Sequence, residues 1–387
     1  MKKGITVSSF LFTVAATIVA TVATTNVFAL EVDREVMPRI QLGGQIMASV
    51  DVPDFDSDPD AESQLSLADS SLLARFDKRL YGEGVAGATI GFTEREDAAV
   101  FHQLNAFYWD RHFSLMMGRT RLRNTLLELP LMRDDDLLEY THVGNASSDE
   151  EFDQIYGTQL SADLLIDGKI QRVGMWAGTR RNGVAYANAP NGFDSVGAGY
   201  VYQQPEELRY VKRLRHAGML VDGQKVETTT GDEWSYALIA GAEANLNIDP
   251  RQNWSLAGQT ILNRGVSGVP TVINLAANES TSVVMSLRFT GRPKLLTRYQ
   301  AGLTFAFKDY VDINEGSQWS VVSNAFYRLG QGVDLLAQLK YTDYGNGLGG
   351  GSDAIVQLGM AFGFDAMFND SIGKRDSILN LEHGYIQ

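Results

Sequence analysis

The sequence predicts an all-β protein, a closed antiparallel β-barrel whose strands cross a lipid bilayer. Three observations lead to this prediction: two-residue alternation of apolar and polar side chains, aromatic residues at the ends of the apolar faces, and short turns that alternate with long loops. In the segment 298–308, Tyr299 and Leu303 share one face while Gln300 and Thr304 share the other. Successive side chains leave a pleated strand on opposite sides, so this segment has one apolar and one polar face. A strand with lipid on one side and water on the other has this pattern.

The same alternation recurs in sixteen segments of the chain. Strands are expected at roughly 38–50, 65–80, 84–95, 98–109, 112–120, 153–166, 169–181, 193–203, 207–219, 233–248, 252–263, 280–291, 295–309, 318–329, 332–343 and 353–366. Trp234, Trp254, Tyr299 and Tyr341 lie at strand ends, where the aromatic girdles of membrane barrels occur. A soluble β-sandwich would also alternate, but a chain of this length would then usually form several domains joined by linkers.

The connections between these segments differ in length in a regular way. Short turns carrying Gly, Pro or Asp are expected at 81–84, 109–111, 167–169, 204–206, 249–251, 291–293 and 330–332. Longer polar segments are expected at 52–63, 182–192, 221–231, 265–278 and 345–352. Bacterial outer-membrane barrels have short periplasmic turns, long extracellular loops and an even number of strands. The segment 377–387 also alternates, so the count is either sixteen or eighteen.

The first residues have the features of an export signal. Lys2 and Lys3 precede an apolar run, and Val27-Phe28-Ala29 resembles a cleavage site. We therefore expect residues 1–29 to be a signal peptide and residues 30–387 to form the barrel. The alternative is a membrane-anchoring helix, which the many threonines of this segment disfavour.

Composition excludes several functions. The chain has 47 Asp and Glu against 33 Lys and Arg, which argues against nucleic acid as a partner. It contains no cysteine, so disulfides do not stabilise it. The five histidines lack metal-ligand spacing, and no Gly-x-Ser-x-Gly motif occurs. The sequence therefore predicts a protein that is not an enzyme and has no cofactor or metal. The alternating acids from Asp54 to Asp60 are expected to form a solvated loop, with a divalent-cation site as the alternative.

One connection, from about 120 to 153, is unlike the others because it is both long and rich in leucine and charge. Its leucines require an apolar surface and its acids require water. Folding the segment inward against the barrel wall would satisfy both and would narrow the lumen.

The chain resembles the general porins of Gram-negative bacteria, which are sixteen-stranded outer-membrane barrels. The resemblance is carried by the export signal, the strand count, and a long third loop that follows a strand ending in Gly118-Arg119. It departs from the family at Leu129-Pro130-Leu131, where some members have Pro-Glu-Phe-Gly-Gly. In this family the loop enters the lumen and presents acids opposite a cluster of wall arginines.

The resemblance implies candidates for the two sides of a pore constriction. By position these are Arg119, Arg121, Arg123, Asp134, Asp135, Asp136 and Glu139. Arg121 and Arg123 share parity with the apolar Leu115 and Met117, so a bulge would have to turn them into the lumen. Further basic residues of the lumen are expected at Arg172, Arg180, Arg209, Arg213 and Arg298, either as an arginine wall or as charges balanced by neighbouring acids.

The resemblance implies a water-filled channel for passive diffusion of small hydrophilic solutes and ions, a homotrimer in contact with outer-membrane lipid and lipopolysaccharide. A channel selective for phosphate or a sugar, with an arginine ladder, is the main alternative. A barrel that serves as an enzyme or adhesin scaffold is a further alternative.

Overall fold

The computed structural model describes residues 39–53, 63–66, 70–80, 84–95, 98–121, 126, 156–167, 170–179, 193, 195–205, 208–228, 231–265, 279–293, 297–311, 313–330 and 332–368. Its strands are β1 (Arg39–Pro53), β2 (Gln64–Ser66), β3 (Ser71–Arg79), β4 (Val85–Arg95), β5 (Ala98–Trp109), β6 (Phe113–Arg121), β7 (Tyr156–Ile166), β8 (Gln171–Thr179), β9 (Ser195–Gln203), β10 (Leu214–Thr228), β11 (Gly231–Asn245), β12 (Gln252–Arg264), β13 (Ser280–Gly291), β14 (Tyr299–Tyr310), β15 (Ser317–Gly330), β16 (Val333–Tyr344) and β17 (Gly351–Phe368). A short 3₁₀ turn, η4 (Asn346–Leu348), precedes the last strand.

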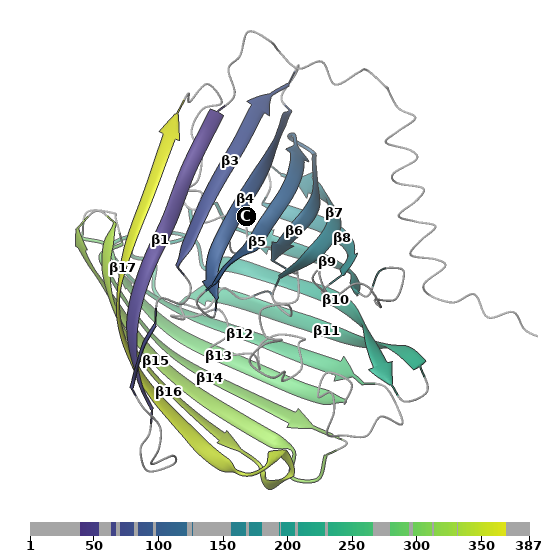
Figure 1. Cartoon of the computed structure of the whole chain (residues 1–387), viewed down its shortest axis with the longest axis vertical. Coiled ribbons are helices and arrows are strands. Elements are labelled where there is room, and N and C mark those ends of the chain that lie inside the picture. Colours follow the sequence, from purple (N-terminus) through teal and green to yellow (C-terminus); the bar gives the residue numbers. More distant parts are fainter. Residues whose placement is uncertain are drawn as a thin grey trace, which may run out of the picture.

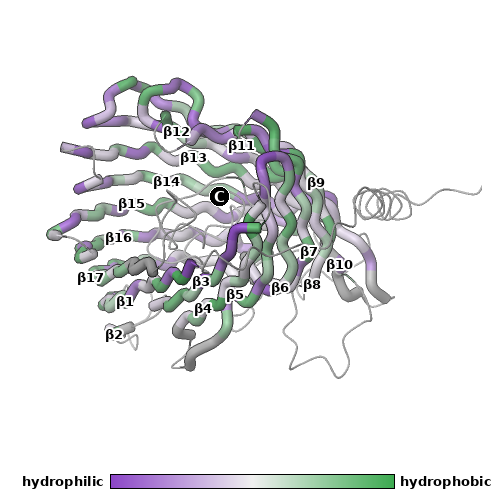
Figure 2. The backbone as a smooth tube through the Cα atoms, turned by 90° about the horizontal axis from the view of Figure 1, so that it is seen from above, coloured by the Kyte–Doolittle hydropathy of each residue, from purple (hydrophilic) through white to green (hydrophobic). Residues whose placement is uncertain are grey.

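Apart from β2 and β3, which both pair with β1, every strand pairs antiparallel with its neighbours in sequence, and the last strand closes the ring on the first. The pairing of β1 with β17 runs from Ile40 opposite Phe368 to Pro53 opposite Ile355. The two strands, purple and yellow, lie side by side in Figure 1. The view from above shows the strands arranged around a central space (Figure 2). Closure leaves no unpaired sheet edge, which is the condition for a sheet to cross a bilayer.

The wall contains sixteen strands because β2 and β3 follow one another along β1. Ser66 lies opposite Ser49, and Ser71 lies opposite Gln45, so one extra residue is inserted between the two pieces. The single strand predicted at 65–80 therefore corresponds to both pieces. The sixteen-stranded antiparallel barrel is thus confirmed. The segment 377–387, whose alternation allowed a count of eighteen strands, lies outside the described residues.

Two of the predicted boundaries were wrong. The strand predicted at 207–219 begins only at Leu214, and the polar loop predicted at 221–231 is strand on both sides of residues 229–230. Polar residues of β10 such as Asp222 are buried on the inner face, at 1 % exposure. A strand facing water on one side carries such residues without ending, so polarity alone marked a loop that is not there.

The two faces of the wall have opposite chemistry. In β14, Leu303 and Phe305 are 51 % and 43 % exposed, while the intervening Thr304 is fully buried. The same alternation holds in β16, where Leu335 and Leu339 are exposed and Gln338 is buried. Green and purple segments alternate along the strands in Figure 2. The exposed apolar side chains form an outer belt, and the faces predicted for 299–308 and 332–343 are confirmed.

Aromatic side chains of the outer face gather at both ends of the strands. At the short-turn end, the ring of Phe289 lies 4.8 Å from Trp254 and 5.9 Å from Tyr299. At the opposite end, Trp319 lies 5.2 Å from Tyr341. Two aromatic rows that border an apolar belt are typical of membrane–water interfaces.

A matched pair of substitutions tests the assignment of the faces. Ala325 points outward and Asn324 inward at the centre of β15. Ala325→Lys should destabilise the barrel in lipid by about 2–4 kcal/mol, because it places a cation at the bilayer midplane. Asn324→Lys should cost much less, because the lumen already accepts Lys340 on the paired strand. Urea unfolding in lipid vesicles measures both, and equal losses would contradict the assignment.

Candidate functional site: the inner face of the barrel

The inner face is lined by buried hydroxyl and amide side chains along β13 to β17. Ser286 and Thr304 lie 2.9 Å apart, and Ser320 and Thr342 are also 2.9 Å apart. These cross-strand hydrogen bonds satisfy polar groups that would otherwise be costly to bury. The wall on this side is therefore polar, and it also carries the buried charged side chains of Arg288 and Lys308.

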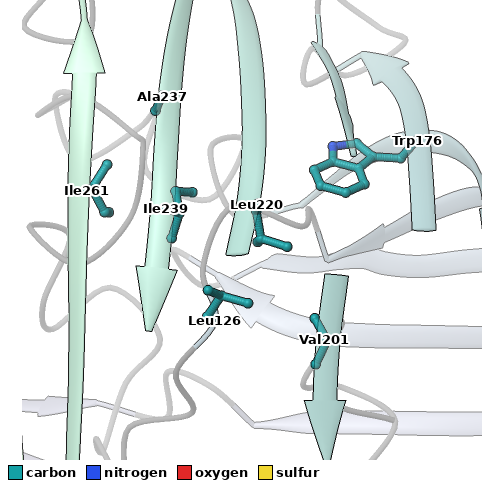
Figure 3. Packing of buried hydrophobic residues seen from close by; sticks show 7 residues of the cluster. All are labelled: Leu126, Trp176, Val201, Leu220, Ala237, Ile239 and Ile261. Atoms are coloured by element: carbon teal, nitrogen blue, oxygen red, sulfur yellow. The ribbon is translucent and has the colours of Figure 1, made fainter. Parts of the chain in front are cut away.

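The adjoining wall, from β8 to β12, carries an apolar patch on its inner face. The patch consists of Trp176, Val201, Leu220, Ala237, Ile239 and Ile261, and it is covered by Leu126 of the long segment after β6. Figure 3 shows Leu126 directed at this wall, close to Val201, Leu220 and Ile239. Leu126 is fully buried. The long segment therefore enters the barrel at this residue.

The niche that receives Leu126 is shaped by two inward glycines. A Cβ atom at Gly218 would lie 2.8 Å from Leu126 Cδ2, and one at Gly241 would lie 3.5 Å from Leu126 Cβ. The backbone N–H of Leu126 donates a hydrogen bond of 2.7 Å to Gln259 Oε1. We call Val201, Gly218, Leu220, Ile239, Gly241 and Gln259 the Leu126 socket. It combines apolar contact with one directional hydrogen bond, so it fixes both the depth and the orientation of this residue.

Close packing against Trp176 requires a glycine at position 197, next to the apolar patch. The indole of Trp176 lies against Gly197, where an added Cβ would be 2.2 Å from Trp176 Cζ2 and 2.7 Å from the Val221 carbonyl oxygen. Gly197→Ala should therefore destabilise the barrel by about 1–3 kcal/mol through overpacking. At Gly258 the nearest atom to an added Cβ is 3.8 Å away, so Gly258→Ala should be neutral or stabilising by up to about 1 kcal/mol. Urea unfolding compares the two; a neutral Gly197→Ala would show that the indole moves freely.

Charged residues gather at the short-turn end of the lumen. Arg215 Nη1 lies 2.5 Å from Glu243 Oε1, which also accepts a 2.9 Å hydrogen bond from Ser255. The guanidinium of Arg288 is 3.7 Å from the same carboxylate oxygen. We call Arg209, Tyr210, Arg215, Glu243, Arg288 and Arg292 the arginine–tyrosine cluster, since the Tyr210 ring lies 5.0 Å from the Arg215 guanidinium and 4.0 Å from that of Arg292. Arg209 interacts electrostatically with both Arg215 and Glu243.

Two other groups of charged side chains lie at this end among the described residues. Arg39 makes a bidentate pair with Asp77 at 2.8 and 2.6 Å, and Arg75 approaches the same carboxylate at 2.8 Å. Arg328 pairs with Asp334 at 2.8 and 2.9 Å. The first group has two cations and one anion and the second has one of each, whereas the groups named in the arginine–tyrosine cluster are four cations and one anion.

The prediction that Arg119 lies in the pore constriction was wrong as to its direction. Arg119 is paired with Leu104 and Thr158, which are both exposed on the outer face, and its Nε donates to the Phe101 carbonyl oxygen at 2.8 Å. The pairing of β6 with β5 and β7 shows no register shift near it. From Phe113 to Arg121 the described pairing of β6 with β7 contains no bulge of the kind expected for Arg121 and Arg123.

The remaining predicted residues separate into three groups. Arg172 is opposite Leu165 and Val201, both buried on the inner face, so Arg172 faces the lumen, while Arg209 belongs to the arginine–tyrosine cluster. Arg213 is exposed and donates to the Leu246 carbonyl oxygen at 2.8 Å; the Arg298 guanidinium lies over the outward ring of Tyr327, 5.6 Å from its centre. The expected lumen position of Arg298 is thus corrected to the outer aromatic row. The others lie outside the described residues: Arg123, Asp134, Asp135, Asp136, Glu139 and Arg180.

The structure also reveals lumen residues that the sequence predictions left out of the site. Glu243, Arg288 and Arg292 come from three different connections or strands, and only the barrel brings them together. The alternation in 280–291 could have placed Arg288 inward, since it shares parity with Ser286. Arg215 shares the two-residue spacing of Arg209 and Arg213, and it sits at a register shift between Leu214 and His216.

Two kinds of feature are absent from the residues that the structure describes. In that part of the chain, no three His, Asp or Glu side chains come together in a way that could hold a metal ion. The acids from Asp54 to Asp60 lie outside it. No helix within it is long and apolar enough to span a membrane.

The fold and the inner face together define a sixteen-stranded barrel with an apolar exterior and a polar, charged interior. Neither a protein-family model nor a curated protein sequence matches the chain. Solved structures with similar folds include the anion-selective porin from Comamonas acidovorans (14 % identity, 85 % of this chain and 100 % of that chain, TM-score 0.59). They also include the outer membrane channel DcaP of Acinetobacter baumannii (13 % identity, 86 % and 99 %, TM-score 0.58). A third is the in-vitro folded trimer form of OmpT, an outer membrane protein of Vibrio cholerae (10 % identity, 84 % and 99 %, TM-score 0.57). At these identities the likeness is one of fold.

Proposed function

We propose that this protein is a porin of the bacterial outer membrane, a water-filled channel for passive diffusion of small hydrophilic solutes and ions. The observation that carries the proposal is the burial of Leu126 in its socket inside a closed barrel with an apolar exterior. A barrel of sixteen strands is wide enough to leave an aqueous passage, and a segment that enters the lumen narrows it. The porin and channel folds among similar structures support the same conclusion.

The constriction is proposed to form where the segment 120–153 follows the wall beyond Leu126. Its acids Asp134, Asp135, Asp136 and Glu139 would face cations of the lumen such as Arg172. Opposed charges in a narrow passage with low-dielectric walls create a transverse field that orients water and polar solutes. Apolar molecules would have to displace that ordered water, so the channel should favour hydrophilic solutes.

Export and assembly are part of the same proposal. Residues 1–29 would be removed as a signal peptide, and the barrel 30–387 would insert in the outer membrane beside lipid and lipopolysaccharide. A homotrimer is supported by a similar fold that is known in a trimer form. Mass spectrometry of the mature chain and of the intact assembly measures both features.

The experiment that tests the function is conductance of the purified protein in planar lipid bilayers. Stepwise openings whose conductance rises nearly linearly with salt concentration are expected of a diffusion channel. The absence of any conductance across several lipid compositions would refute the proposal.

A substrate-selective channel is the second candidate, and the arginine–tyrosine cluster is the observation that favours it. Saturation of conductance at micromolar to millimolar substrate would distinguish this candidate from simple diffusion.

A further inference from the structure

We infer that the arginine–tyrosine cluster is a binding site for a phosphate-type oxyanion, located at the short-turn mouth of the channel. The inference deepens the proposed function, because it names the class of solute that the lumen would retain. Arg209 and Tyr210 belong to the connection between β9 and β10, and Arg292 follows β13, so the site lies at one end of the barrel.

Among the described residues of the cluster, four guanidinium groups gather near one carboxylate, that of Glu243. Arg215 and Arg288 share one oxygen of Glu243, at 2.5 and 3.7 Å. Arg215 is 6 % exposed, so water screens its charge poorly. Grouping like charges in a sheltered site is unfavourable unless an anion of matching charge offsets the repulsion.

Hydrogen-bond donors of the cluster also exceed its acceptors. Within the described part of the chain, Nε of Arg215 and Nε of Arg292 are buried and have no hydrogen-bond partner. Each guanidinium presents five donors in a plane, and Glu243 together with Ser255 offers few acceptors. Buried donors of this kind normally have a hydrogen-bond acceptor. A ligand rich in oxygen atoms would supply the acceptors that this site lacks.

Tyr210 explains why a phosphate suits this arrangement better than a halide. Its ring lies 4.0 Å from the Arg292 guanidinium and 5.0 Å from that of Arg215. Stacking on an aromatic ring fixes a guanidinium through its face and leaves its N–H edge free to donate. Fixed planar forks recognise pairs of oxygens on a phosphate group, which a spherical chloride does not offer.

The test is block of chloride current by inorganic phosphate in planar bilayers, with phosphate added to one side at a time. Millimolar phosphate should reduce the current more strongly from the short-turn side, because the site lies at that mouth. Arg292→Gln should raise the phosphate concentration needed for half-block by roughly tenfold, as expected for loss of one charged hydrogen-bonding group. For Arg292→Lys, this concentration should lie between those of the wild type and Arg292→Gln, since an ammonium group keeps the charge but lacks the planar fork.

The matched control is Arg213→Gln, which removes an arginine near the same turn whose guanidinium is exposed and bound to the Leu246 carbonyl oxygen. This variant should keep the wild-type phosphate block. Equal block from both sides, or the same block in Arg292→Gln as in wild type, would overturn the site while leaving the channel function intact.

A second measurement does not depend on conduction. In detergent, phosphate should raise the unfolding temperature of the wild type and of Arg213→Gln, and should raise that of Arg292→Gln less, because a ligand stabilises only a state that binds it. Acetate, a singly charged oxyanion, should give a smaller rise. If the protein conducts but phosphate does not raise its unfolding temperature, the phosphate site is rejected and the channel function stands. If phosphate raises the unfolding temperature of a protein that does not conduct, the site stands and the channel function is rejected.

Discussion

Replacement of Leu126 by aspartate is expected to release the long segment from the wall and to increase single-channel conductance. Loss of a fully buried leucine costs about 2–5 kcal/mol, and an unpaired carboxylate in the apolar socket adds a desolvation penalty. Since about 1.4 kcal/mol corresponds to a tenfold change in an equilibrium, the docked arrangement should fall to a minor population. Single-channel recording measures the conductance, and polymer exclusion measures the width of the passage.

Two control variants separate this effect from general damage to the barrel. Leu126→Met conserves the volume of the side chain and should cost less than about 1.5 kcal/mol, so its conductance should match the wild type. Leu246→Asp introduces the same carboxylate at an exposed turn residue and should leave the conductance unchanged. If Leu126→Asp conducts like the wild type, the segment does not narrow the channel at this residue.

The second large effect is expected at Glu243, the carboxylate of the arginine–tyrosine cluster. Glu243→Gln should destabilise the barrel by about 3–5 kcal/mol, because breaking a buried pair leaves its cations uncompensated. It should also move the reversal potential toward preference for chloride, since the local positive charge increases. Urea unfolding in lipid vesicles and bi-ionic potentials measure the two effects.

The matched control for Glu243 is Asp334, whose partner Arg328 has a side chain that is 42 % exposed. Asp334→Asn should cost only about 0–1 kcal/mol, as is typical of solvated pairs. Adding Arg215→Gln to Glu243→Gln should recover part of the lost stability, because it removes one of the unpaired cations. If Glu243→Gln loses no more stability than Asp334→Asn, water screens the charges of the cluster.

Much of the fold could be predicted because alternation is a local property of each strand. Leu303 and Thr304 reveal their faces from sequence neighbours alone, and the aromatic rows follow from their positions at strand ends. The boundaries of β10 could not be read in this way, since a polar residue such as Asp222 looks the same in a loop and on a wet inner face. The number of strands became definite only when Ile40 was found opposite Phe368.

The functional residues were predicted less well, because direction at a strand end depends on register. Arg119 was assigned to the lumen from the Gly118-Arg119 resemblance, while its parity with Met117 pointed outward, and the register follows the parity. Arg298 has inward parity but precedes β14, where a long side chain can turn back over Tyr327. Arg215 reaches the lumen through a bulge that no pattern in 207–219 indicated.

The sequence by itself determined that this chain forms a barrel with one apolar and one polar face, since each strand carries that information in its own two-residue period. It also singled out the segment 120–153, whose leucines and acids require different surroundings. Only the tertiary structure decided where Leu126 docks, because its socket is assembled from β9 to β12. The same holds for Glu243 and its arginines, which come from strands and turns far apart in the chain. Closure of the sheet brings these residues together, and no local pattern encodes closure.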